Sequence, residues 1–232
     1  MKSWCIAKPS ARFVAKMEDV LEVYQRPHDP KRPVVCLDEK SKELHSAPHG
    51  VLPMEPRAQD EPGKPRREDY EYRRNGTRNL FLWVEPLAGR RHVEATERRC
   101  SPDFARQLKA LADEHYPQAE VVVLVTDNLN THSSAALYET FPPAEARRLA
   151  QRFEWHYTPE HGSWLNMAEI ELSVLERQCL RRRIPDAPAL EQEAAAWEEK
   201  RNRAQTTIRW QFTAADARIK LRRLYPQMEC KI

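Results

Sequence analysis

The stretch VVVLVTDNLNTH, residues 121–132, sets the expectation for the whole fold. Five apolar residues, four of them β-branched, run without a polar break and are followed by Thr126 and Asp127. Such a short apolar run is typical of a parallel strand that helices cover on both faces. Open α/β sheets bind their ligands at the carboxyl ends of the strands, so Asp127 is expected at a ligand site. The alternative role for Asp127 is that of a turn or helix-capping aspartate.

A second apolar run, PVVCLDE at residues 33–39, also ends in acids. If the two strands are parallel neighbours, Asp38 and Asp127 come close together at one edge of the sheet. Two adjacent carboxylates repel each other unless a cation lies between them. The two strand ends together therefore predict a cation site.

Composition narrows the class of protein. The 232 residues suffice for one large domain or for a core with an appendage. Charged residues make up 31% of the chain but the net charge is only +3, so clusters of basic residues matter more than the total. The five cysteines include no Cys-x-x-Cys pair, and no apolar run approaches the ~18–20 residues that cross a bilayer. We expect a cytoplasmic protein that has no membrane partner.

Hydrophobic periodicity and turn residues predict the remaining elements. Helices are expected over residues 11–25, 101–115, 143–153, 163–183, 190–205 and 214–224. Strands are expected over residues 33–38, 70–74, 79–85, 90–97, 121–126 and 154–158, with a turn at Asn75-Gly76. The proline-rich stretch 45–67 is expected to be an exposed, irregular excursion.

This order of elements is that of the RNase H-like fold, an α/β fold in which a mixed sheet of about five strands is flanked by helices. Acids on the first strand, the fourth strand and a helix after the fifth strand meet at one edge of that sheet. The expected domains are an N-terminal helical arm and linker (1–32), the core (33–185, with the exposed insertion 45–67) and C-terminal helices packed on the core (186–232).

Two residues are candidates for the third acid, Glu169 and Glu171. Residues two apart on a helix lie about 200° apart, so only one of them can face the site. Helical-wheel reasoning does not decide between them. Glu169 also has a purely structural alternative, a capping box in which Asn166 is the N-cap.

Three motifs together resemble the catalytic blocks of DDE transposases, most closely the bacterial insertion-sequence branch of the mariner-like superfamily. They are Cys-Leu-Asp-Glu at residues 36–39, Thr-Asp-Asn-x-x-x-His at 126–132 and His-Gly-Ser-Trp-Leu-Asn-x-x-Glu at 161–169. The resemblance implies that Asp38, Asp127 and Glu169 are the catalytic and metal-binding residues. Two Mg²⁺ or Mn²⁺ ions suit such a site, for cleavage of a DNA strand that frees its 3′-hydroxyl and for attack of that hydroxyl on a phosphate of target DNA, which joins the strand end to the target. The implied partner is double-stranded DNA, both transposon ends and target, bound by a homodimer, and the resemblance therefore implies a nucleoid-associated protein.

Members of this family carry a helix-turn-helix region before the catalytic domain, and the residues before position 33 leave no room for one. The sequence therefore predicts a catalytic domain that lacks recognition of transposon ends. Two other functions stay open: a general RNase H-like nuclease without strand transfer, and a catalytically silent DNA-binding or assembly remnant of a transposase.

Residues around the acids have expected supporting roles. Asn128, His132 and Asn166 are expected to orient a carboxylate or to meet a phosphate. The alternative for His132 is a place in the first turn of the following helix. Trp164 is expected either to wedge against a base or, more commonly for tryptophan, to anchor the core.

Clustered arginines are expected to contact DNA phosphates. One group flanks the proline-rich excursion and another ends the long helix, where favourable interaction with the helix dipole explains it equally well. The predicted DNA-binding residues are Arg66, Arg67, Arg73, Arg74, Arg181, Arg182 and Arg183.

Overall fold

A five-stranded mixed sheet forms the centre of the computed structural model, which describes residues 10–52, 54–56, 64–65, 67–68 and 70–226. The strand order is β5-β4-β1-β6-β7. β1 (Val34–Ser46), β4 (Arg73–Glu85) and β5 (Arg90–Thr96) are antiparallel neighbours, and β6 (Val122–Thr126) and β7 (Phe153–Tyr157) continue the sheet in parallel from β1. This arrangement confirms the predicted RNase H-like sheet.

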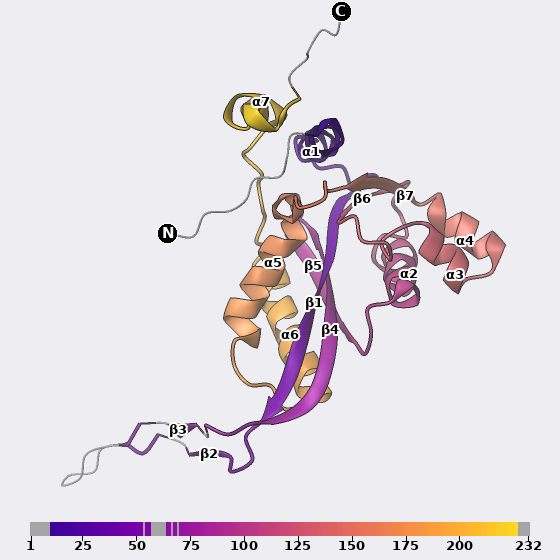
Figure 1. Cartoon of the computed structure of the whole chain (residues 1–232). Coiled ribbons are helices and arrows are strands. Elements are labelled where there is room, and N and C mark those ends of the chain that lie inside the picture. The colour runs from indigo at the N-terminus through magenta and orange to yellow at the C-terminus, as the bar shows by residue number, and fades with distance from the viewer. Residues whose placement is uncertain (1–9, 53, 57–63, 66, 69, 227–232) are drawn as a thin grey trace, which may run out of the picture.

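Helices cover both faces of this sheet (Figure 1). Because strand side chains alternate between faces, neighbouring residues such as Cys36 and Leu37 enter two separate apolar clusters. One face packs against α1 (Ala11–Val23), α5 (Met167–Leu175), α6 (Ala187–Arg203) and α7 (Ala214–Lys220). The other face packs against α2 (Ser101–Ala110), α3 (Ala135–Thr140) and α4 (Pro143–Ala150). Burial on both faces explains the apolar run that leads to Asp127.

β4 is one long strand, so the turn predicted at Asn75-Gly76 is wrong. Glu43 of β1 pairs with Thr77 and His45 pairs with Arg74, which leaves two residues of β4 opposite Leu44. Gly76 has φ 95, a backbone conformation that glycine adopts without a steric penalty. The Asn-Gly pair therefore forms a β-bulge within the strand rather than a turn between two strands.

The long helix predicted over residues 163–183 is interrupted. It consists of the 3₁₀ turn η2 (Ser163–Leu165), α5 and the π-helical turn η3 (Glu176–Leu180). Asn166 is extended (φ −81, ψ 115) and its side-chain oxygen accepts a hydrogen bond from the backbone N–H of Ala168. Asparagine competes with the backbone in this way at helix starts, so α5 begins only after it.

Other predicted boundaries also shift. The helix expected to end at residue 153 ends at Ala150, and Phe153 begins β7. The helix expected to begin at residue 190 begins at Ala187, because the Asp186 side chain caps it and proline is tolerated in a first turn. The sequence analysis did not predict α3. The π-helical turn η1 (Leu111–His115) follows α2, and the 3₁₀ turn η4 (Arg222–Leu224) comes after α7.

The excursion after β1 contains regular structure. β1 itself continues to Ser46, and β2 (Val51–Leu52) pairs antiparallel with β3 (Arg67–Glu68). An isolated bridge between Glu55 and Lys64 extends this ladder. In Figure 1 the β2–β3 ladder extends away from the layered body at the far end of β1 and β4. The expectation of an irregular excursion is therefore wrong for these paired residues.

α1 is part of the core. Met17, Val20 and Leu21 are fully buried against the sheet, and the Ser10 side chain caps the helix by accepting a hydrogen bond from Phe13 N–H. Among the helices that the structure describes, none combines the length and apolar character that a bilayer-spanning segment requires.

Candidate active site

The two strand-end acids lie at one edge of the sheet. β1 and β6 are parallel, and Cys36 pairs with Val125. Asp38 and Asp127 each follow two residues after that pair, so both lie at the carboxyl end of the parallel ladder. This edge is the place where open α/β sheets bind ligands.

Asp38 is a buried carboxylate, with 8% of its surface exposed. Its Oδ1 accepts a hydrogen bond from the N–H of Glu39 (2.8 Å) and its Oδ2 accepts one from Asn166 Nδ2 (3.3 Å). Burial is the largest cause that raises the pKa of Asp38 to about 7, and the negative charges of Asp127, Glu39 and Glu169 raise it further. The structure thus places Asp38 within electrostatic reach of both other predicted acids.

Asn166 connects the two elements that carry Asp38 and Glu169. Besides Asp38, its side-chain amide donates to Leu37 O of β1 (3.0 Å), and its oxygen caps α5. Asn166 is fully buried, so these hydrogen bonds have no competition from water. The first turn of α5, which carries Glu169, is thereby fixed against the carboxyl end of β1.

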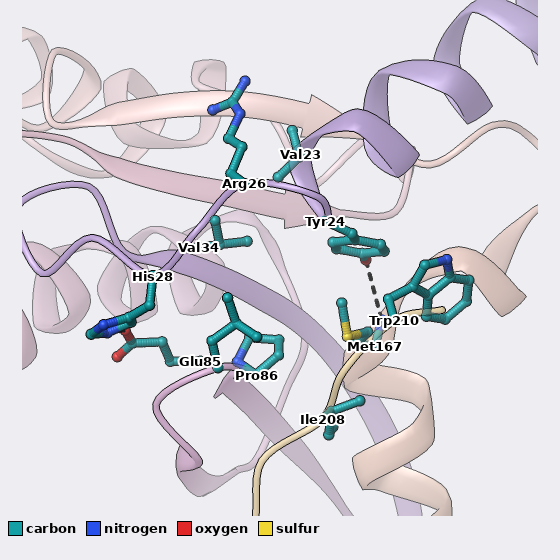
Figure 2. A pocket seen from close by; sticks show the side chains of 11 residues that line it. Val23, Tyr24, Arg26, His28, Val34, Glu85, Pro86, Met167, Ile208 and Trp210 are labelled. Atoms are coloured by element: carbon teal, nitrogen blue, oxygen red, sulfur yellow. Dashed lines mark hydrogen bonds and ion pairs between the residues drawn. The ribbon is translucent and has the colours of Figure 1, made fainter. Parts of the chain in front are cut away.

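Tyr24, just after α1, contacts the same turn. Its hydroxyl donates to Leu165 O (2.7 Å) and accepts from Met167 N–H (3.4 Å), the contact drawn as a dashed line in Figure 2. Its ring packs against Trp210 with centroids 5.3 Å apart. In Figure 2 these side chains line a pocket between the end of α1, the start of β1 and the segment around Ile208. α1 therefore helps to hold the start of α5.

Glu169 and Glu171 point to different places. Glu171 is 1% exposed and is held by two cations: Arg201 Nη2 is 2.6 Å from its Oε1, and Arg91 Nε is 3.2 Å from its Oε2. It therefore faces β5 and α6. Glu169 is half-buried and within electrostatic reach of Asp38. The capping box considered for Glu169 forms only in part. The Asn166 side chain caps α5, but the backbone N–H of Asn166 donates to Ser163 O (2.7 Å).

His132 lies between two acids. Its Nδ1 contacts Asp127 Oδ1 and its Nε2 lies 3.0 Å from Glu39 Oε2 as an ion pair. The imidazole is 2% exposed and stacks on Phe104, with ring centroids 4.4 Å apart. Burial by itself lowers the pKa of His132, but the contacts with Asp127 and Glu39 raise it to about 9. At neutral pH it is an imidazolium that fixes the Asp127 carboxylate.

Three residues of this site were not predicted from the sequence. Glu39 faces the α2 side of the sheet, because side chains alternate between the faces of a strand. Its position next to Asp38 was the sequence feature that could have indicated a role at the site. Tyr24 had no signal beyond its place on an apolar helix face. Lys16 of α1 donates from Nζ to Asn128 Oδ1 (2.7 Å), a contact across 112 positions that no local pattern could indicate.

The predicted DNA-binding arginines do not lie with the acids. Arg67, Arg73, Arg74 and Arg181 are exposed, whereas Arg182 pairs with Glu193 and Arg183 donates to Glu71 O (3.1 Å). Arg66 lies outside the described residues. Arg73 pairs with Ser46, eight positions along β1 from Asp38, or about 26 Å at ~3.3 Å per residue. This group therefore lies near the far end of the sheet.

Trp164 is partly exposed, at 44% of its surface. Its ring meets the ring of Phe212 edge to face, with centroids 6.4 Å apart. It is therefore not the buried core anchor that was considered for it.

The donor set fits a hard divalent cation. Asp38 and Asp127 at the strand ends, with Glu169 on the adjoining helix turn, offer carboxylate oxygens of the kind that Mg²⁺ and Mn²⁺ prefer. Burial is the main cause of the raised pKa of Asp38 and the neighbouring acids add to it, so a cation here would stabilise the ionised carboxylate. Within the described part of the chain, however, no three His, Cys, Asp or Glu side chains already form a closed metal-binding group. The contact of Asp127 with His132 occupies one of its oxygens.

The sheet order and the acids at its edge define an RNase H-like nuclease domain. The chain belongs to the DDE superfamily endonuclease family, whose model matches residues 33–191. No curated protein matches the chain in sequence.

Two solved structures share the fold. The Mos1 strand transfer complex has a TM-score of 0.54 and 16% identity, over 88% of this chain and 62% of that chain. The mariner Mos1 paired end complex with Mg has a TM-score of 0.54 and 17% identity, over 98% of this chain and 68% of that chain. This chain thus spans less than two thirds of the length of the first of these proteins.

Proposed function

We propose that this chain is the catalytic part of a transposase, which cleaves a DNA strand and transfers it to a target in a reaction that depends on divalent metal. The observation that carries the proposal is the buried Asp38, which lies at the carboxyl end of the parallel ladder between β1 and β6, the strand that leads to Asp127, and is tied through Asn166 to the turn that carries Glu169. Neighbouring carboxylates repel one another unless a cation lies between them. The names of the two similar structures, a strand transfer complex and a paired end complex with Mg, support the same reaction.

Asp38, Asp127 and Glu169 are the proposed metal ligands. When bound, Mg²⁺ or Mn²⁺ would supply Lewis acidity for the attacking water or hydroxyl and for the leaving oxygen. Asn166 holds Asp38 and the first turn of α5 in register, and His132 holds Asp127. A rearrangement of side chains accompanies metal binding in this proposal, because apo sites are commonly looser than the working complex.

Glu171 is not a ligand in this proposal. Its two carboxylate oxygens are engaged by Arg91 and Arg201, so its charge is already balanced inside the core. The family motif and the geometry therefore favour the same acid, Glu169.

The proposed substrate is double-stranded DNA, both transposon ends and target, bound by a homodimer. The motifs favour the bacterial insertion-sequence branch of the mariner-like superfamily. The similar structures are named as complexes at transposon ends, which supports DNA as the partner.

The test combines nicking with joining. Wild-type protein, Asp127→Asn and the matched control Glu114→Gln, an exposed acid on η1, are incubated with supercoiled plasmid and a labelled duplex that has free 3′-hydroxyls, in Mn²⁺. We expect wild type and Glu114→Gln to nick the plasmid and join label to it, and Asp127→Asn to do neither. Nicking without joining would show that the protein is a general nuclease without strand transfer. No nicking by the wild type would contradict the proposal.

A further inference from the structure

α1 brings a lysine to the loop that carries Asp127. Besides its hydrogen bond to Asn128, the Lys16 ammonium lies 5.7 Å from the ring centroid of Tyr157, at the end of β7. Asn128 directly follows Asp127 in the chain. A cation on the N-terminal helix therefore adjoins the proposed metal site.

A cavity of about 130 Å³ lies beside this lysine, between the start of α1 and residues 159–161. Arg12 and Lys16 line it from the helix, and His161 lines it from the turn that follows β7. The turn is closed by a hydrogen bond from Gly162 N–H to Pro159 O (2.8 Å), and His161 has φ 61 within it. Two segments that are far apart in the sequence thus present basic side chains to one space.

These basic side chains share the space without a bound acid. Within the described part of the chain, no carboxylate forms an ion pair with Arg12, Lys16 or His161. Burial and then the positive charge of Arg12 lower the pKa of Lys16, and Glu160, which also lines the cavity, opposes this effect. Like charges gathered in one cavity favour an anion there.

The size of the cavity limits the anion. Pockets that enclose drug-sized ligands measure about 300–1,000 Å³, whereas a water takes up about 30 Å³, so this cavity holds only a small group. A phosphate group, which accepts charge-assisted hydrogen bonds from arginine and lysine, meets both the charge and the size.

We propose that the cavity between Arg12, Lys16 and His161 binds a backbone phosphate of the DNA strand that passes through the acidic site. The inference rests on the proposed function, since it takes DNA as the substrate. Lys16 then links the bound phosphate to the loop of Asp127 through Asn128. DNA is held next to the acids by α1, rather than only by the arginines at the far end of the sheet.

The test measures DNA binding without metal or turnover. Affinity for a fluorescein-labelled duplex is determined by anisotropy in EDTA at ~50 and ~200 mM KCl. The double variant Arg12→Gln/Lys16→Gln is compared with wild type and with a charge-matched control, Arg106→Gln/Arg147→Gln, on the exposed surfaces of α2 and α4. We expect the double variant to bind about tenfold more weakly at the lower salt, with a log–log salt slope smaller by about 0.9, the value for one phosphate contact. An unchanged affinity and slope, or an equal loss in the control, would overturn the proposal.

The single variant Arg12→Gln is the control for a folding defect in the double variant. Arg12 is exposed, so its replacement leaves the core intact. We expect this single variant to bind DNA about threefold more weakly while its melting temperature rises with Mn²⁺ as in wild type. Unchanged DNA affinity in Arg12→Gln would contradict the proposal. Because binding is measured in EDTA, the result does not depend on whether the protein nicks DNA.

Discussion

At the residue scale, α5 carries two glutamates in opposite electrostatic settings. Glu171 is enclosed between Arg91 and Arg201 in the core, whereas Glu169 lies at the edge near Asp38. Removing one partner of a buried ion pair leaves an uncompensated charge, which costs about 3–5 kcal/mol. Within the part of the chain that the structure describes, no ion pair holds the half-buried Glu169, so the same change there has no such cost.

We therefore expect Glu171→Gln to lower the free energy of unfolding by about 3–5 kcal/mol and Glu169→Gln to change it by less than about 1 kcal/mol. Urea unfolding at neutral pH measures both. Equal losses in the two variants would show that Glu171 is not the structural acid that its contacts indicate.

The sequence could indicate the acids but not their surroundings. Asp38 and Asp127 follow apolar strands, a pattern visible in one dimension. Helical periodicity could not separate Glu169 from Glu171, because the arginines that hold Glu171 are distant in sequence and approach α5 only in the folded chain. The family motif supplied what helical periodicity could not.

At the element scale, Glu154 of β7 forms ion pairs with the segment between α1 and β1. Arg26 Nη1 lies 2.7 Å from its Oε1, and Arg32 and His156 also contact it. Burial by itself raises the pKa of Glu154, but Arg26, His156 and Arg32 lower it to about 2. The folded carboxyl thus has a lower pKa than in the unfolded chain, roughly 4.3. Its stabilisation is present above that value and is lost as pH falls through about 2.

We expect Glu154→Gln to be less stable than wild type by about 1 kcal/mol at neutral pH, since these partners are partly exposed. The difference between the two proteins should shrink as the pH falls from roughly 4.3 towards 2. Urea unfolding of both proteins at several pH values tests this. A difference that does not vary with pH would show that charge at Glu154 is not its cause.

Two glycines next to strands provide a matched comparison. Gly76 in the β4 bulge has φ 95, and a Cβ there would meet no atom within 4 Å. Gly89, before β5, has φ 66, and a Cβ there would lie 2.7 Å from the backbone of Gln205. Backbone strain affects alanine at both positions, but steric overlap affects it only at Gly89.

We expect Gly76→Ala to cost about 1–2 kcal/mol of stability and Gly89→Ala to cost at least about 1 kcal/mol more. Chemical denaturation of both variants measures the difference. A larger cost at Gly76 would mean that the backbone of the bulge is more constrained than the backbone at Gly89, despite the close approach of Gln205 to Gly89.

Element boundaries were predictable only where local pattern dominates. The apolar run of β6 was predicted to within one residue, because burial on both faces leaves a continuous signal. The bulge at Gly76 was predicted as a turn, because Asn-Gly favours positive φ in both settings. The break at Asn166 depends on its bonds to Leu37 and Asp38, which lie on another element.

At the scale of the whole molecule, the order of elements was sufficient to predict the RNase H-like fold. The sequence did not show that α1 lies beside the acids, since Lys16 and Asn128 are joined only by the tertiary fold. The proposed site draws on β1, β6, α5 and α1, so a cation bound there would stabilise the whole domain.

We expect Mn²⁺ at about 100 times its dissociation constant to stabilise the wild type by roughly 2.7 kcal/mol, or about 5–10 °C in melting temperature. Asp127→Asn should show a markedly smaller rise, and Glu114→Gln the full one. Differential scanning calorimetry measures all three. Equal rises in wild type and Asp127→Asn would mean that Mn²⁺ binds elsewhere.

The central claim is that Asp38, Asp127 and Glu169 share a divalent cation, and anomalous scattering from a crystal soaked in Mn²⁺ tests it most directly. We predict manganese density in contact with carboxylate oxygens of all three residues, at about 2.0–2.2 Å, with Glu171 still held by its arginines. Manganese bound only at other sites, or bound by Glu171 in place of Glu169, would contradict the account.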